Sequence, residues 1–165
     1  MNLPKPKQWA TAYATNEFIS VNTCSGLRSS ARDPEGKEIF FPLDVSDEQL
    51  GAGILEALSA SRFLSPDEVG SFFDLAVTEK YYENWVELLT EKFGYKSRRD
   101  VFKDMKHCMI DRVDGVITIK PTNHEKLEAW GGKGIDKNDY ENLDAAASEA
   151  DLGKALKSCF AKCIG

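Results

Sequence analysis

EKYYENWVELLTEKFGYKSRRDVFKDMKHCMIDRVDGVITIKPTNHEKLEAWGG, residues 79–132, is the stretch of sequence that decides the fold. Its first part has the apolar spacing of an amphipathic helix over about residues 79–93. The apolar side of that helix is expected to carry Tyr81, Trp85, Leu88 and Leu89. Gly94 is placed to end it in the left-handed conformation, and Ser97 is placed to cap a short helix that runs to about Lys103.

A β-hairpin over residues 108–120 follows these helices. Asp114-Gly115 lies between two runs of strand-forming residues, which is typical of a two-residue type I′ turn. Such a turn pairs Val113 with Val116. The buried face of the hairpin is then expected to carry Cys108, Ile110, Ile117 and Ile119. A slip of one residue would turn that face toward solvent, so the register is well determined.

The rest of the chain predicts a single domain, residues 1–165, of the mixed α/β (α+β) class. Ser46 and Ser65 are placed to cap two further helices, and a last helix is expected over residues 148–163. Short strands are expected at residues 17–21, 37–43 and 140–143, and a helical turn at 122–125. Residues 1–15 are expected to be loosely ordered. We therefore predict a central, mostly antiparallel sheet that includes the 108–120 hairpin and is packed by about five helices.

The charge of the chain is acidic and unevenly distributed. The 165 residues carry a net charge of −6, and residues 33–87 contain 13 Asp or Glu against 3 Lys or Arg. An acidic surface repels phosphate backbones, which disfavours direct nucleic-acid binding, and it attracts basic partners. The same carboxylates would also suit solvated helix faces, and charge alone leaves both interpretations open.

Cysteine usage and hydropathy predict a cytoplasmic protein. The four cysteines, Cys24, Cys108, Cys159 and Cys163, form no CxxC pair, which favours reduced thiols. The basic N-terminus lacks the apolar region of a signal peptide. No stretch approaches the roughly 20 apolar residues that a membrane span needs.

No residue pattern indicates catalysis, a metal or a cofactor. His107 and Cys108 are adjacent, but neighbours in a strand point to opposite faces and would not meet. Cys159 and Cys163 could supply two metal ligands, whereas a tetrahedral zinc site needs four. The alternative is a small cytoplasmic enzyme or an anion- or RNA-binding module that uses His107, His124 and the basic cluster at residues 96–106. It predicts a concave site around those residues.

A family resemblance extends this interpretation. The residues that carry it are Leu50-Gly51, Leu58-Ser59-Ala60-Ser61-Arg62, Trp85, Tyr95-Lys96-Ser97, Met105-Lys106-His107-Cys108, residues 114–119, Pro121, residues 124–130 and Cys159-Phe160-Ala161-Lys162-Cys163. Over roughly residues 40–165 they resemble the bacterial contact-dependent growth inhibition (CDI) immunity proteins, CdiI. The resemblance implies a cytoplasmic binding protein that blocks the C-terminal toxin domain of a sibling's surface effector, CdiA. Such toxins are commonly nucleases, and many of them are basic.

The resemblance assigns no site residues, because its shared positions are those of helix faces, turns and the hairpin. The acidic segment supplies a hypothesis instead. Its carboxylates are expected to form a face that contacts the toxin: Asp33, Glu35, Glu38, Asp44, Asp47 and Glu48. Opposite charge across an interface speeds association and makes it salt-dependent, so this face would suit a basic toxin.

Overall fold

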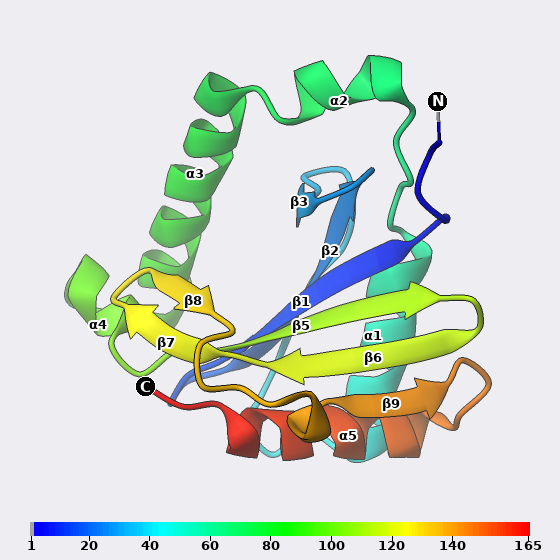
Figure 1. Ribbon diagram of the computed structural model, residues 1–165. Helices are drawn as coiled ribbons and strands as arrows, with labels where there is room; N and C mark the ends of the chain where they lie inside the picture. The colour runs from blue at the N-terminus through cyan, green and yellow to red at the C-terminus, as the bar shows by residue number, and fades with distance from the viewer. Residues whose placement is uncertain (1) are drawn as a thin grey trace.

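A seven-stranded antiparallel sheet forms the centre of the protein, shown as a computed structural model in Figure 1, which describes residues 2–165. Its strands are β1 (Gln8–Ala14), β2 (Ile19–Gly26), β3 (Ser30–Arg32), β4 (Glu38–Phe41), β5 (Lys106–Val113), β6 (Val116–Pro121) and β9 (Glu141–Asp144). They lie in the order β3-β2-β1-β5-β6-β9, and β4 pairs with the other half of β2. The predicted class, a single mixed α/β domain with an antiparallel sheet, is confirmed.

The N-terminal segment differs from the prediction. Residues 8–14 form β1, which lies inside the sheet between β2 and β5, so this part of residues 1–15 is ordered, while Met1 lies outside the described residues. Ala10 and Ala12 are buried in the core, and Trp9 is 9% exposed. β2 is also longer than the strand expected at residues 17–21, and all eight of its residues are buried.

The hairpin prediction is confirmed. Val113 pairs with Val116, and Ile110 pairs with Ile119. Asp114 and Gly115 have φ angles of 50° and 76°, which are the left-handed values of a type I′ turn. The expected core face is buried throughout: Cys108, Ile110, Ile117 and Ile119.

Two helices, α1 (Asp47–Ser59) and α5 (Glu149–Lys162), cover one face of the sheet. The Ser46 hydroxyl caps α1 by accepting a hydrogen bond from the Gln49 N–H at 3.1 Å. The two helices approach closely where each has a glycine. A Cβ on Gly51 would lie 1.7 Å from a backbone oxygen of α5, and one on Gly153 would lie 1.9 Å from a backbone oxygen of α1.

The opposite face of the sheet is covered only in part. Here lie α2 (Pro66–Phe72), α3 (Leu75–Phe93), α4 (Arg98–Phe102) and the small hairpin of β7 (Asn123–Lys126) and β8 (Ala129–Gly131). A 3-10 turn, η1 (Lys137–Asp139), precedes β9. Tyr13 points to this side, where its ring lies 5.1 Å from that of Trp85. Phe18, Leu89 and Phe102 complete a second core with Trp85.

Two local predictions are wrong on this side. Residues 123–126 form a strand, not a helical turn, because Asn123 and His124 pair with β8. On α3, Trp85 and Leu89 are buried as expected, but Tyr81 and Leu88 are 43% and 44% exposed. The apolar stripe of α3 therefore meets the sheet only over its second half.

Candidate functional site

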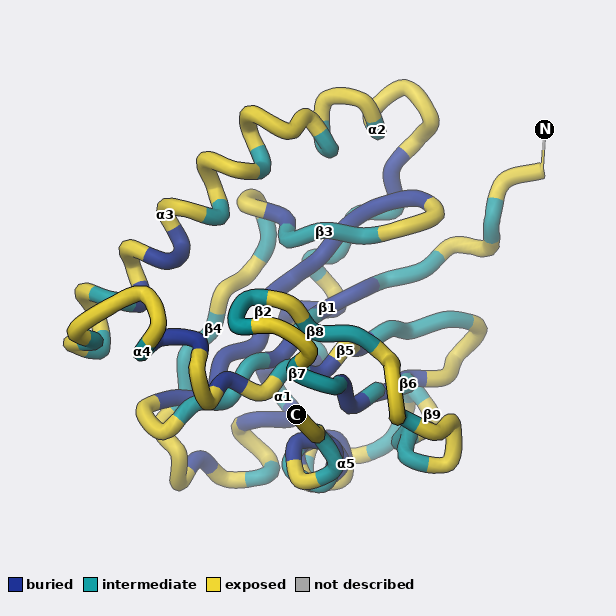
Figure 2. The backbone as a smooth tube through the Cα atoms, turned by 60° about the vertical axis from the view of Figure 1, so that its left-hand side comes forward, coloured by how far each residue is buried: buried dark blue, intermediate teal, exposed yellow. Residues whose placement is uncertain are grey.

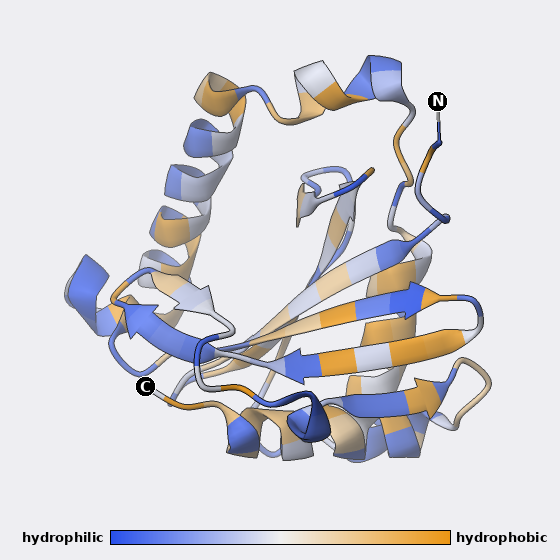
Figure 3. Ribbon diagram, viewed as in Figure 1, coloured by the Kyte–Doolittle hydropathy of each residue, from blue (hydrophilic) through white to orange (hydrophobic). Residues whose placement is uncertain are grey.

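α2 and the first half of α3 stand away from the sheet as an arch, defined here as residues 65–84. None of these residues is buried, and Leu75 is 75% exposed (Figure 2). Hydrophobic and hydrophilic positions alternate along the arch (Figure 3). An apolar surface that a helix does not bury against its own core is typical of a binding site.

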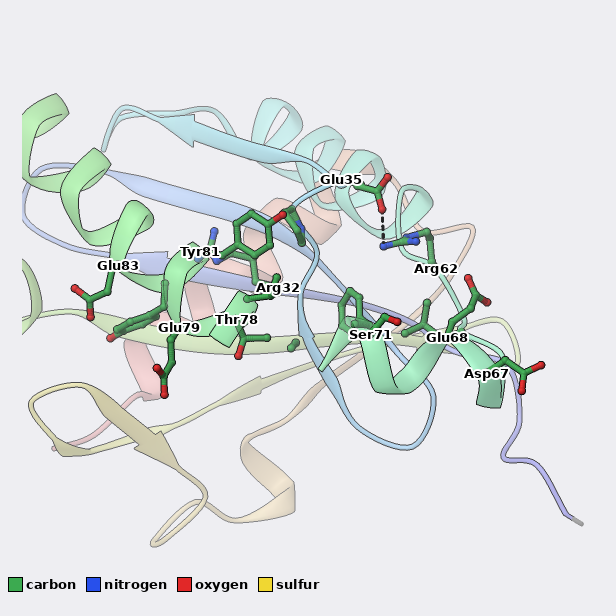
Figure 4. A pocket seen from close by; sticks show the side chains of 16 residues that line it. Arg32, Glu35, Arg62, Asp67, Glu68, Ser71, Thr78, Glu79, Tyr81 and Glu83 are labelled. Atoms are coloured by element: carbon green, nitrogen blue, oxygen red, sulfur yellow. Dashed lines mark ion pairs between the residues drawn. The ribbon is translucent and has the colours of Figure 1, made fainter. Parts of the chain in front are cut away.

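A cleft of about 1170 Å³ lies between the arch and the β3 region (Figure 4). Five carboxylates line it, four of them from the arch: Glu35, Asp67, Glu68, Glu79 and Glu83. Two arginines, Arg32 and Arg62, also line it. Five negative and two positive charges give this lining a net charge of −3. Phe72, Tyr81 and Tyr82 add aromatic surface.

Arg62 is held by a buried carboxylate below the cleft. The Asp33 side chain is fully buried and accepts hydrogen bonds from Arg62 Nε at 2.7 Å and Nη2 at 3.0 Å. The Ser25 hydroxyl and the Glu35 N–H also donate to it, at 2.6 and 2.9 Å. Burial alone would raise the pKa of Asp33, but the bonds from Arg62 and Ser25 lower it below its ordinary value. Asp33 therefore fixes Arg62, which also pairs with Glu35 at 3.0 Å.

Arg32 is fixed at the other side of the cleft. Its guanidinium lies 4.3 Å from the centroid of the Trp85 ring and pairs with Glu38 at 3.0 Å. Cation–π contact and ion pairing both hold the arginine in place. Because both arginines are engaged by the protein's own carboxylates, the charge left for a partner comes mainly from Asp67, Glu68 and Glu79. None of these three has an ion-pair partner within residues 2–165.

A charged cluster holds the lower part of the arch. Arg98 pairs with Glu83 at 2.7 Å and with Glu128 at 2.8 Å, and the Tyr82 hydroxyl donates to Glu128 at 2.7 Å. The bonds from Arg98 lower the pKa of both carboxyls. The cluster connects α3 to α4 and to the β7–β8 hairpin. The part of α3 that carries Tyr82 and Glu83 is therefore anchored, whereas α2 and the start of α3 are not held by this cluster.

The structure does not gather the six predicted acidic residues on one face. Only Glu35 lines the cleft, Glu38 is occupied by Arg32, and Asp33 is 3% exposed and therefore unable to contact a partner directly. Asp47 pairs with Lys157 of α5 at 2.8 Å, on the opposite side of the sheet. Asp44 and Glu48 are exposed near the start of α1. The four carboxylates of the arch, which line the cleft, were not predicted as site residues.

A second cavity, of about 430 Å³, contains much of what the alternative interpretation requires. His107, His124, Lys103 and Lys106 all line it. Burial lowers the pKa of His107 to about 4, with a further contribution from the charge of Arg32. Both ring nitrogens of His107 lack a hydrogen-bond partner within the described chain, and the ring stacks on Tyr13 at 4.7 Å. His107 is thus a neutral packing residue at pH 7. Arg98, part of the same basic cluster, is neutralised in the arch network instead.

His107 and Cys108 point to opposite faces, as expected, since Cys108 lies in the core below α1 and α5. Across residues 2–165, no group of three or more His, Cys, Asp or Glu side chains is placed to hold a metal ion. None of the helices described has the length and apolar character needed to cross a membrane.

Comparison with known proteins finds a family and a relative that match this chain over most of its length. A sequence model described as CDI immunity protein matches residues 8–163. The chain is 39% identical over 169 residues to the immunity protein CdiI-YPIII of Yersinia pseudotuberculosis serotype O:3 (strain YPIII), across 95% of this chain and 96% of the relative.

Two solved structures have the same fold. A chain of the CdiA-CT/CdiI toxin and immunity complex from Yersinia pseudotuberculosis matches with a TM-score of 0.91 and 38% identity, over 98% of this chain and 99% of that chain. A protein of unknown function from Neisseria meningitidis, NMB0488, matches with a TM-score of 0.90 and 33% identity, over 99% of each chain.

Proposed function

Because the chain belongs to the CDI immunity protein family, we propose that it binds the C-terminal toxin domain of a cognate CdiA effector and neutralises it. The observation that carries this function is the likeness, over nearly the whole chain, to a chain of a toxin and immunity complex. Neutralisation by this protein is stoichiometric binding and requires no catalysis. It takes place in the cytoplasm, where a reduced, acidic inhibitor meets the toxin.

The cleft under the arch is the proposed toxin-binding site. Its lining has a net charge of −3, and exposed apolar side chains of α3 lie along its rim. Interfaces combine aromatic anchors with complementary charge, so this surface suits a basic toxin domain with an apolar contact point. A nuclease fits that description, because proteins that neutralise phosphates carry Lys and Arg at the surface that binds them.

The first experiment is co-expression with the toxin domain encoded beside this gene, followed by purification through a tag on the toxin. We expect a one-to-one complex in which toxin activity is abolished. Free toxin, or a complex that remains active, would overturn the proposed function. Nuclease activity of the isolated toxin is then measured on DNA and on RNA, and inactivity on both would exclude a nuclease.

The position of the site is tested by charge reversal. The Asp67→Lys/Glu79→Lys variant changes the charge of the cleft by four units without removing an ion pair or the Glu68 cap. The matched control is Asp44→Lys/Glu48→Lys, which applies the same change to the predicted acidic residues outside the cleft. Association of the cleft variant should slow roughly tenfold at low ionic strength, and the difference should shrink as salt screens it. If only the control variant slows, the toxin binds near the start of α1 instead.

A further inference from the structure

Three cysteine sulfurs lie where β5 meets the end of α5. Cys108, on β5, and Cys159, on α5, are both fully buried in the core. Cys163 follows the last helical residue, and its Sγ lies 3.7 Å from that of Cys108. The two residues are 55 positions apart in the chain, so the fold alone creates this pair.

Cys163 differs from the other cysteines in its access to small molecules. It is half-buried and lines the 430 Å³ cavity together with Lys106, His124 and Trp130. Cys24, Cys108 and Cys159 are at most 3% exposed. Cys163 is therefore the one of the four cysteines that lines this cavity, and the Cys108 sulfur lies 3.7 Å from its sulfur.

The surroundings of Cys163 favour its reactive form. The Cys108 thiol can donate its hydrogen to the Cys163 sulfur, and the charge of Lys106 also stabilises a thiolate, so the pKa of Cys163 falls to about 7 despite its partial burial. The thiolate is the nucleophilic form of cysteine. Burial raises the pKa of Cys108, which keeps that residue as the thiol. In its own protonated form, Cys163 donates to the His107 carbonyl at 3.4 Å.

We propose that Cys163 is a site of oxidative modification by small peroxides and that Cys108 is its resolving thiol. In the first step the Cys163 thiolate attacks one oxygen of the peroxide and the O–O bond breaks. Hydroxide departs, and Cys163 becomes a sulfenic acid. In the second step the Cys108 sulfur attacks the sulfenic sulfur, and the S–O bond breaks. The Cys108 proton combines with the leaving hydroxide as water. The hydroxide released in the first step takes up the proton that Cys163 lost on ionising, so two thiols are oxidised to a disulfide while one hydrogen peroxide is reduced to two water molecules.

The geometry requires only a small movement. A disulfide has a sulfur–sulfur distance of about 2.05 Å, so the two atoms must approach by about 1.7 Å from their separation of 3.7 Å. Cys163 lies in the three-residue end of the chain beyond α5, and its ψ of 142° is already extended. That end is held by the pairing of Ile164 with Thr122 and His124.

The test begins with the reactivity of the native protein. Brief alkylation with iodoacetamide at pH 7.5, followed by peptide mapping, should modify Cys163 at least roughly tenfold faster than Cys24. Treatment of the reduced protein with hydrogen peroxide should then remove two hydrogens and join the Cys108 and Cys163 peptides. Under the same treatment Cys163→Ser should form no crosslink. Cys108→Ala should retain a sulfenic acid that dimedone traps on Cys163, and Cys159→Ser should crosslink like the wild type.

The alkylation rates and the peroxide product are measured on the wild-type protein and need no substitution. They therefore test the proposal even if a core variant fails to fold. Equal alkylation of all four cysteines would overturn the proposal. So would a peroxide product that lacks the Cys108–Cys163 bond, including one in which Cys159 is the partner of Cys163.

Discussion

Replacement of Asp33 by asparagine tests whether this residue is structural, as its burial indicates, or contacts the toxin, as its place in the acidic segment first predicted. The carboxylate accepts four hydrogen bonds and has no exposed side-chain surface. Asparagine has the same shape but presents an NH₂ group in place of one oxygen. That group cannot accept the bond from Arg62, and the negative charge opposite the guanidinium is lost.

The magnitude follows from these contacts. A hydrogen bond to a charged group contributes about 1.5–3 kcal/mol net. Arg62 is 41% exposed and keeps its pair with Glu35, so water compensates part of the loss. We expect the free energy of unfolding to fall by about 2 kcal/mol, near the middle of that range. For a chain of this size the melting temperature should fall by about 4–8 °C.

Urea and thermal unfolding followed by circular dichroism measure this change, with Asp44→Asn as the matched control at an exposed carboxylate. The control should stay within about 0.5 kcal/mol of the wild type. The lowered pKa of Asp33 adds a pH signature. Its contribution to stability is present above the unfolded-state pKa of about 3.9 and is lost as pH falls through the lower folded-state pKa. The gap between variant and wild type should therefore persist from pH 5 to 8 and close in stronger acid.

Equal stability of the Asp33 and Asp44 variants at neutral pH would refute the structural role. Toxin affinity gives a second readout. At 25 °C, well below the melting temperature, Asp33→Asn should still bind the toxin, because a fully buried side chain has no surface for a partner to contact and Arg62 keeps its pair with Glu35. A large loss of affinity in a folded variant would mean that Asp33 contacts the toxin.

Three further predictions concern packing, titration and the anchoring of the arch. In urea unfolding, Gly153→Ala should cost about 1–3 kcal/mol because its Cβ would meet a backbone oxygen of α1, whereas Gly70→Ala, with open space around it, should gain about 0.5–1 kcal/mol. As pH falls from about 6 to about 4, the wild type should lose about 1.4 kcal/mol of stability per pH unit, because unfolded chains protonate His107 before the native state does. In a pH-dependent unfolding series, His107→Phe should lack this component. Arg98→Ala should speed hydrogen exchange along the first half of α3 roughly tenfold, and Arg99→Ala should not.

Each of these has a contradicting result. If both glycine variants changed stability in the same direction, the close approach of α1 and α5 would not be limiting. A His107→Phe variant with the full acid slope would place the titrating group elsewhere. Unchanged exchange in Arg98→Ala would mean that the arch is held by packing alone.

The sequence predicted those elements whose determinants lie close together in the chain. The hairpin follows from Asp114-Gly115 and ten flanking residues, and the helix starts follow from a serine within three residues of the group that it caps. β1 was missed because its own signal is weak, since it alternates alanine with Thr and Tyr. One of its partners, β2, follows it directly, but the other, β5, lies about a hundred residues away.

The site could be predicted only in its chemistry. The acidic character of residues 33–87 is a property of the sequence, but the surface on which each carboxylate falls is a property of the fold. Asp33 and Arg62 are 29 residues apart, and nothing local to either indicates that one is buried against the other. Likewise, helical periodicity placed Tyr81 on an apolar stripe. It could not show that the sheet ends before that stripe does.

The central position of β1 has a consequence for synthesis of the protein. β1 has its partner β2 available once both have left the ribosome, but its other edge has no partner until residues 106–112 are made. At about 5–20 residues per second, an interval of about a hundred residues lasts roughly 5–20 s. During that time each nascent chain exposes one unpaired strand edge in the cell. A chain that ends before β5 therefore lacks the central pairing of the sheet, and only finished molecules have the fold that binds a partner.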